Sequence, residues 1–175
     1  MNTRALAACA LLLTLTACGD AAAEDAATAT ASLQEEILQN AATGLGEVTE
    51  DEAGCIARGA VDEIGVARLQ EYGMLGDDLE VNKEIGTVTL EEADAASLAA
   101  TFVDCVDVES LFEKQFSQRS AGAAKLTAKQ KRCINDAVNP AVIEDVLAAS
   151  FRGDQDNKAY KKLTKSLLLC TVGKR

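Results

Sequence analysis

Apolar side chains recur at intervals of three and four residues over most of the chain between residues 48 and 171. Leu98, Phe102 and Val106 form one such series. An α-helix turns once every 3.6 residues, so this spacing places the apolar side chains of each segment on one face to be buried. Only Thr87 to Leu90 and its surroundings suggest extended structure, and a loop explains them equally well. The sequence therefore predicts an all-α fold, a small helical bundle.

Capping signals divide this region into separate helices. A Ser or Thr three residues before a Glu or Gln is typical of a capping box, and it occurs at Ser32, Thr49, Thr89 and Thr127. Asn139 followed by Pro140 indicates a further helix start, and Gly73 and Gly153 suit helix ends. We expect breaks near 62–65, 74–88, 106–108, 119–126, 139 and 153–156.

The first 18 residues carry an export signal. Arg4 precedes an apolar run from Ala5 to Leu15, which is too short to span a bilayer and is typical of a signal peptide. Leu15-Thr16-Ala17-Cys18 follows, and it resembles the lipobox of bacterial lipoproteins. The resemblance implies that residues 1–17 are removed, that Cys18 receives a diacylglycerol, and that the protein is anchored to the outer face of the bacterial cell membrane. The alternative is an ordinary secretory peptide, with Cys18 an incidental thiol.

Residues 18–31 are interpreted as the lipidated cysteine and a disordered tether, followed by a helical domain over 32–175. Positions 19–31 hold only small, polar or acidic side chains. Such a segment buries too little apolar surface to offset the entropy lost on ordering. The alternative is a helical extension, because Ala is the best helix former.

Four cysteines remain in the helical domain, and an even number in an exported chain predicts disulfides. They are Cys55, Cys105, Cys133 and Cys170, at spacings of 50, 28 and 37 residues. No C-x-x-C occurs, and zinc sites draw their ligands from such close pairs, so a metal site is disfavoured. Free buried cysteines are the other alternative.

An internal sequence similarity, which we call the echo, favours one of the three disulfide pairings that four cysteines allow. Residues 48–56, VTEDEAGCI, align with residues 126–134, LTAKQKRCI, and a Leu follows each Cys by 14 positions. Each half then closes with an apolar helix that carries its second cysteine. We interpret these as two repeat units, 48–106 and 126–171, although helical sequences of biased composition also align by chance. Two similar units predict the disulfides Cys55–Cys105 and Cys133–Cys170.

The net charge of −11 is distributed unevenly. Residues 19–119 carry 23 acidic and 5 basic side chains, a net −18, whereas residues 120–175 carry 5 acidic and 11 basic, a net +6. An acidic chain with few aromatics is a poor partner for nucleic acid. The two regions form either two solvated faces of opposite sign or a basic end that contacts anionic lipid headgroups.

Catalytic motifs are absent from the sequence. It contains no His, which excludes His-based acid/base chemistry and the usual nucleophile systems. Asp77-Asp78 and Asp154-Gln155-Asp156-Asn157 lack the pattern of a calcium loop and predict exposed turns. Glu63 and Asp104 lie near apolar stripes, where partly exposed carboxylates are expected. We therefore predict no metal, no cofactor and no enzymatic activity.

Segments such as AGCIARGAVDEIGV and FVDCVDVESLF resemble uncharacterised exported proteins of high-GC Gram-positive bacteria, over most of residues 48–170. This resemblance implies no particular activity and transfers no functional residue. We expect a membrane-anchored, non-catalytic binding or interaction module of the cell envelope, with a protein partner or anionic lipid headgroups. The alternatives are an accessory lipoprotein without its own ligand, a carrier of a small apolar ligand, and an enzyme that uses carboxylates alone.

Overall fold

A computed structural model describes residues 17–40, 48–82, 88–119, 126–154 and 156–172. These residues form an all-α fold, as predicted. The helices are α1 (Ala17–Asn40), α2 (Glu50–Ile64), α3 (Val66–Glu71), α4 (Glu92–Cys105), α5 (Val108–Arg119), α6 (Ala128–Ala137), α7 (Pro140–Phe151) and α8 (Lys158–Val172). Within the described segments, β pairing is limited to one antiparallel bridge between Leu75 and Val81. The predicted signal peptide falls almost entirely on residues 1–16, outside the described part.

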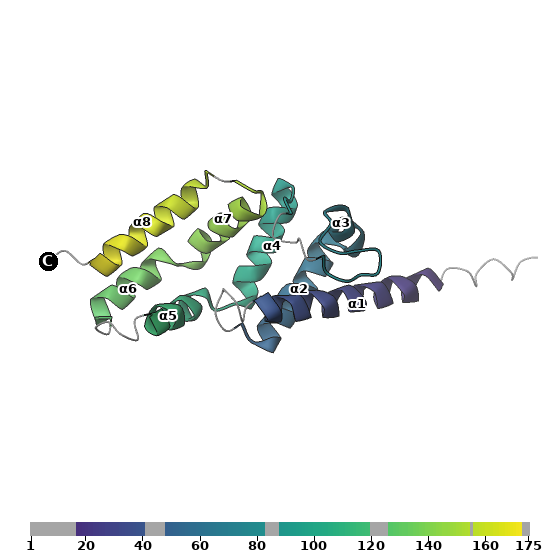
Figure 1. The fold of residues 1–175 in the computed structure, drawn as a ribbon, viewed down its shortest axis with the longest axis horizontal. Helices are drawn as coiled ribbons and strands as arrows, with labels where there is room; N and C mark the ends of the chain where they lie inside the picture. Colours follow the sequence, from purple (N-terminus) through teal and green to yellow (C-terminus); the bar gives the residue numbers. More distant parts are fainter. Residues whose placement is uncertain (1–16, 41–47, 83–87, 120–125, 155, 173–175) are drawn as a thin grey trace, which may run out of the picture.

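The helices form an elongated arrangement in which α4 joins two groups (Figure 1). On one side α2 packs against both α1 and α4, with α3 beside α1 and α2. On the other side α7 packs against α4, and α8 packs against α6 and α7. The N-terminal end of α1 and the C-terminal end of α8 lie at opposite ends of the long axis (Figure 1).

Three of the predicted helix starts are confirmed. Thr49 and Thr127 each cap a helix through a complete capping box, with Glu52 and Gln130 as the reciprocal partners. Asn139 caps α7, and its side chain accepts a hydrogen bond from the backbone N–H of Val142. These caps satisfy backbone N–H groups that have no partner inside the helix.

Two predicted starts are wrong. The N-cap of α4 is Glu91, which makes no side-chain cap, so Thr89 lies just outside the helix. Ser32 lies inside α1, where its hydroxyl accepts a hydrogen bond from the backbone N–H of Val81 at 3.0 Å. The Ser-x-x-Glu pattern there reflects a tertiary contact rather than a helix start.

Gly73 and Gly153 end their helices as predicted, both with positive φ. In each case the following residue donates a backbone hydrogen bond five positions back, from Met74 to Leu69 and from Asp154 to Ala149. This is the Schellman arrangement, which favours glycine because other residues are strained at positive φ.

The prediction of a disordered tether over 18–31 is wrong, because α1 covers this segment without a break. Ala29 is completely buried and Leu33 nearly so, and both belong to the same apolar cluster as residues of α2, α3 and α4. Ala26, Ala29, Leu33 and Ile37 are spaced by three or four residues, so they form a stripe whose first members are small. High helix propensity and this stripe together outweigh the ordering cost that favoured disorder.

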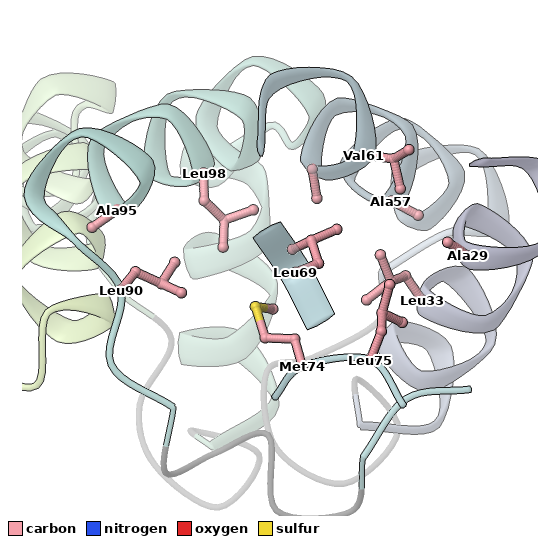
Figure 2. Packing of buried hydrophobic residues seen from close by; sticks show 11 residues of the cluster. Ala29, Leu33, Ala57, Val61, Leu69, Met74, Leu75, Leu90, Ala95 and Leu98 are labelled. Atoms are coloured by element: carbon pink, nitrogen blue, oxygen red, sulfur yellow. The ribbon is translucent and has the colours of Figure 1, made fainter. Parts of the chain in front are cut away.

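The core consists of two main apolar clusters. The first joins α1, α2, α3, α4 and the loop after α3, and Figure 2 shows Leu69 in its middle. The second joins residues of α6, α7 and α8 with Val106, Val108 and Leu111. Ile56 of α2 belongs to the second cluster and Phe151 of α7 packs against the first. The two groups of helices therefore share side chains across their boundary.

The order of elements in the two predicted repeat units is the same. Each has a helix with an early cysteine, a middle helix and a last helix that ends at or near a cysteine: α2, α3, α4 and then α6, α7, α8. The structure pairs Cys55 with Cys105 and Cys133 with Cys170, with Cα–Cα distances of 5.6 and 5.5 Å. These are the two pairs that the echo predicted, one within each unit.

Candidate functional site

The carboxylates singled out from the sequence do not form a reactive centre. Glu63 and Asp104 are both exposed, on α2 and α4. Asp78 accepts a hydrogen bond from the backbone N–H of Glu80, and Asp154 accepts one from that of Asp156, so both stabilise turns. Within the described segments, no three side chains of the metal-binding types gather in one place.

A polar cluster that the sequence reasoning missed lies between α3 and α4. The Arg68 guanidinium contacts three carboxylates: Asp94 at 3.0 Å, Glu91 at 2.6 Å and Glu71 at 3.3 Å. The Tyr72 hydroxyl donates to Asp94 at 2.5 Å and accepts from the backbone N–H of Glu91 at 3.2 Å. The Arg68 Cζ atom also lies 5.0 Å from the centre of the Tyr72 ring, a cation–π distance.

These contacts shift the pKa values of the cluster in a consistent way. The pKa of Asp94 is lowered, first by the hydrogen bond from Tyr72 and then by the one from Arg68. The pKa of Tyr72 is raised, first by burial and then by its bond to Asp94. The bond to Asp94 is likewise the largest cause that raises the pKa of Arg68. All three side chains therefore keep their ordinary protonation states at neutral pH.

This cluster is suited to holding α3 against α4 rather than to catalysis. An acid or base in catalysis needs a pKa near the working pH, and the shifts move Asp94 and Tyr72 away from neutrality. The signal in the sequence is the pair Arg68 and Tyr72, four residues apart and so neighbours on one helical turn. Their partner is 22 or more residues further along, which spacing alone does not reveal.

Two of the hollows on the surface are lined by residues that the structure describes. One has a volume of about 450 Å³ and lies between α1 and α2, where small side chains such as Ala27 and Ala31 line it together with Arg58 and Asp62. The other, of about 360 Å³, lies around the turn between α4 and α5 and beside Pro140. Both are open to solvent, so an occupant of either would remain partly in water.

The outer surface of α8 combines positive charge with exposed apolar side chains. We call it the α8 outer face and define it as Lys158, Lys161, Lys162, Lys165, Leu168 and Leu169, all of which are exposed. Leu168 and Leu169 are 57% and 70% exposed, although leucine is among the residues most often buried. The helix contains four lysines and no acidic residue.

The inner side of α8 explains why this face points outward. Leu163 and Cys170, seven residues apart, are buried in the second apolar cluster, and Leu167 packs partly against it. Residues 161, 165, 168 and 169 lie on the opposite side of a helix with 100° between successive residues. The same 3.6-residue pattern that buries one stripe therefore leaves both leucines in solvent.

Two devices hold α8 in place. Its start is fixed by Asn157, a buried side chain that donates to the carbonyl of Val146 at 3.1 Å and accepts from the N–H of Tyr160 at 2.9 Å. Near its end, the Cys133–Cys170 disulfide joins it to α6. The α8 outer face therefore lies on a helix that is fixed near both ends.

The basic residues of the C-terminal part are partly neutralised. Lys131 pairs with Glu113, Lys161 with Asp156 at 2.7 Å, and Arg152 with Glu92 at 3.7 Å. Lys158, Lys162 and Lys165 on α8 and Lys129 and Arg132 on α6 are exposed as well. Positive charge is thus concentrated on α6 and α8, as expected, with some carboxylates among it.

Cys18, the predicted lipidation site, falls in the first turn of α1. None of the described helices is both long and apolar enough to cross a bilayer. The chain matches no protein-family model, no curated protein and no solved structure.

Proposed function

We propose that this protein is a lipid-anchored, non-catalytic binding module of the cell envelope, which contacts another envelope component through the α8 outer face. The observation that carries the proposal is the exposure of Leu168 and Leu169 beside the lysines of α8. Adjacent exposed apolar side chains of this size are typical of interaction sites, because leaving them in water is unfavourable.

The sequence around Cys18 supports the anchor. Its lipobox resemblance implies a diacylglycerol on the Cys18 thiol, and α1 runs unbroken from Ala17 to Asn40. From residue 21 onward, where the side chains of α1 are described, Ala26 is the first that packs against the core. Eight residues of helix rise about 12 Å, so a lipidated Cys18 would keep the folded body close to the bilayer.

The polar cluster around Asp94 supports a non-catalytic role. Asp94 already accepts hydrogen bonds from Tyr72 and Arg68, and its side chain is only 21% exposed. A carboxylate held in this way stabilises the α3–α4 contact and has little capacity left for a substrate.

Site-specific photo-crosslinking in intact cells tests the binding surface. A photoreactive residue in place of Leu169 should give crosslinked products with an envelope component, whether lipid or protein. The matched control places the same residue at Ala67, an exposed position on α3. Equal crosslinking from both positions, or none from Leu169, would overturn the proposed binding surface.

Processing of the N-terminus tests the anchor separately. The mature protein should begin at Cys18 and carry acyl mass there, and Cys18→Ala should abolish lipidation, so that the protein shifts to the soluble fraction or remains unprocessed. A mature N-terminus elsewhere without acyl mass would refute the anchor, whatever the crosslinking result.

A further inference from the structure

We propose that the occupant of the α8 outer face is the surface of an anionic lipid bilayer, with Leu168 and Leu169 entering its headgroup region. This inference rests on the proposed function, in which the same face is the binding surface, and it names the partner.

The charge of the helix favours a negatively charged partner that is extended in space. Lys158, Lys161, Lys162 and Lys165 follow one another along two turns of α8, which carries no acidic residue. Each lysine near an anionic bilayer gains from the negative surface potential, which decays within about 10 Å. A row of lysines along one helix therefore suits a planar surface, where all of them lie within that range together.

The position of the leucines favours a bilayer over a purely polar surface. Leu168 and Leu169 lie three and four residues after Lys165, one helical turn further on, and both lie on the side of α8 opposite to buried Leu163 and Cys170. Surface-binding helices combine Lys with Leu or aromatic residues, and they bury the apolar ones at the boundary of headgroups and acyl chains. Lysine stems are long enough for their charged ends to remain at the headgroups while the leucines insert.

The rest of the molecule is compatible with this contact. The strongly acidic region, residues 19–119, supplies α1 to α5, whereas α8 packs against α6 and α7. Lys129 and Arg132 are exposed on α6, which the Cys133–Cys170 disulfide joins to α8. The local charge at this end is thus positive although the whole chain carries −11.

The position of α8 relative to α1 implies an orientation. The start of α1, which holds Cys18, and the end of α8, which holds Leu168 and Leu169, lie at opposite ends of the long axis (Figure 1). Two membrane contacts so placed would make the domain lie along the bilayer rather than stand on it.

The absence of tryptophan from the chain makes a direct test available. Leu169→Trp introduces a single tryptophan at a position that is already 70% exposed. The full mature protein carrying it is added to vesicles of phosphatidylcholine alone, or of equal parts phosphatidylcholine and phosphatidylglycerol, with brominated acyl chains as quenchers. We expect a blue-shifted, quenched emission in the anionic vesicles only.

Two matched variants complete the experiment. Ala67→Trp on α3 should stay unquenched in both vesicles, because this exposed residue lies outside the face. Lys162→Glu with Lys165→Glu in the Leu169→Trp background should weaken the quenching response to anionic lipid by about tenfold or more, since two favourable charges become unfavourable.

The other outcomes overturn the inference and separate it from the proposed function. Unquenched Leu169→Trp in vesicle-bound, acylated protein would leave the anchor standing and refute docking. Equal quenching in both vesicles would refute the need for anionic lipid. Crosslinking of position 169 to a protein, or a dimer in light scattering that Leu168→Ser with Leu169→Ser abolishes, would assign the face to a protein partner or a second copy.

Discussion

Gly59 of α2 lies against Thr101 of α4, one helical turn from the Cys55–Cys105 disulfide that joins the same two helices. Cys55 and Gly59 are four residues apart, and so are Thr101 and Cys105. The two contacts are therefore neighbours along one helix pair. A Cβ atom on Gly59 would fall well inside van der Waals contact with the Thr101 Cγ2 methyl. Glycine is needed here for close approach of the helices, at a point that the disulfide also holds together.

We predict that Gly59→Ala destabilises the protein. Overpacking of a tight contact costs about 1–3 kcal/mol, whereas the better helix propensity of Ala returns at most about 1 kcal/mol. Urea unfolding should show a lower midpoint with an unchanged slope. The double variant Gly59→Ala with Thr101→Ala removes the Cγ2 methyl and should recover most of the loss.

Gly54, in the same helix, provides the control. A Cβ there would meet the ends of the Gln34 and Arg58 side chains at 3.2 and 3.4 Å, and these flexible groups can move aside. Gly54→Ala should therefore be neutral or stabilise by up to about 1 kcal/mol. Equal destabilisation by both substitutions would show that the Gly59–Thr101 contact is not the cause.

Much of the fold follows from local rules that the sequence displays. The capping boxes at Thr49 and Thr127 and the glycines at 73 and 153 mark helix ends because they satisfy backbone groups within a few residues. The same rule failed at Ser32, where a hydroxyl serves the distant backbone of Val81. The helix over residues 18–31 is not predicted for a different reason. Composition marks this segment as small and polar, and it does not show that alanine at helical spacing forms a buried stripe.

The candidate site was only partly predictable. Periodicity predicts that Leu163 and Leu167 face the core and that the lysines of α8 lie on its solvent side, but it does not show whether another element covers Leu168 and Leu169. The packing of α6 and α7 decides this, and it leaves Leu168 and Leu169 outside. The cluster around Asp94 joins side chains 22 or more residues apart, so it too depends on tertiary packing that spacing in the sequence does not show.

Acid should weaken the contact between α3 and α4. The pKa of Asp94 is lowered in the folded protein by Tyr72 and Arg68, so its contribution to stability is present above its ordinary value of 3.8. That contribution is lost as pH falls below this value and through the folded pKa. Urea midpoints measured from about pH 5 downward should decline less in Asp94→Asn than in the unmodified protein. Parallel declines would show that other carboxylates account for the acid sensitivity.

High pH should also weaken the contact between α3 and α4, here through ionisation of Tyr72, so that stability falls as pH rises. Its pKa is raised above 10.0 in the fold, first by burial, so its contribution is present below 10.0 and is lost as pH rises through the folded value. Tyr72→Phe should lower stability at neutral pH, because Asp94 and the N–H of Glu91 lose a partner. It should also flatten the alkaline loss, and tyrosine absorbance in the two proteins would report the titration directly.

The cap of α8 should be sensitive to a single substitution. Asn157 is buried and uses both ends of its amide, one on Val146 and one on Tyr160. Asn157→Ala should cost about 1–2 kcal/mol, the usual range for loss of an N-cap. The neighbouring exposed Asp156→Asn, which alters only a surface pair with Lys161, should change stability by less than about 1 kcal/mol. A similar effect from both would argue against the capping role.

Removal of the two disulfides should have comparable global but different local effects. In the chain-entropy account each crosslink restricts the unfolded chain, and loops of 50 and 37 residues correspond to about 4 kcal/mol apiece as an upper figure. Cys55→Ala with Cys105→Ala leaves α2 and α4 packed together and with α1 and α7 around them. Cys133→Ala with Cys170→Ala instead releases the end of α8, which packs only against α6 and α7 among its main contacts. Hydrogen exchange in the second variant should therefore rise first in α8 and α6, while α1, α2 and α4 keep their protection.

Because Leu168 and Leu169 directly precede Cys170, the same variant should also lose the quenching of Leu169→Trp by anionic vesicles, whereas the first variant should retain it. A uniform rise in exchange over all helices would show that the two groups of helices open as one cooperative unit, through the side chains they share at Ile56 and Phe151.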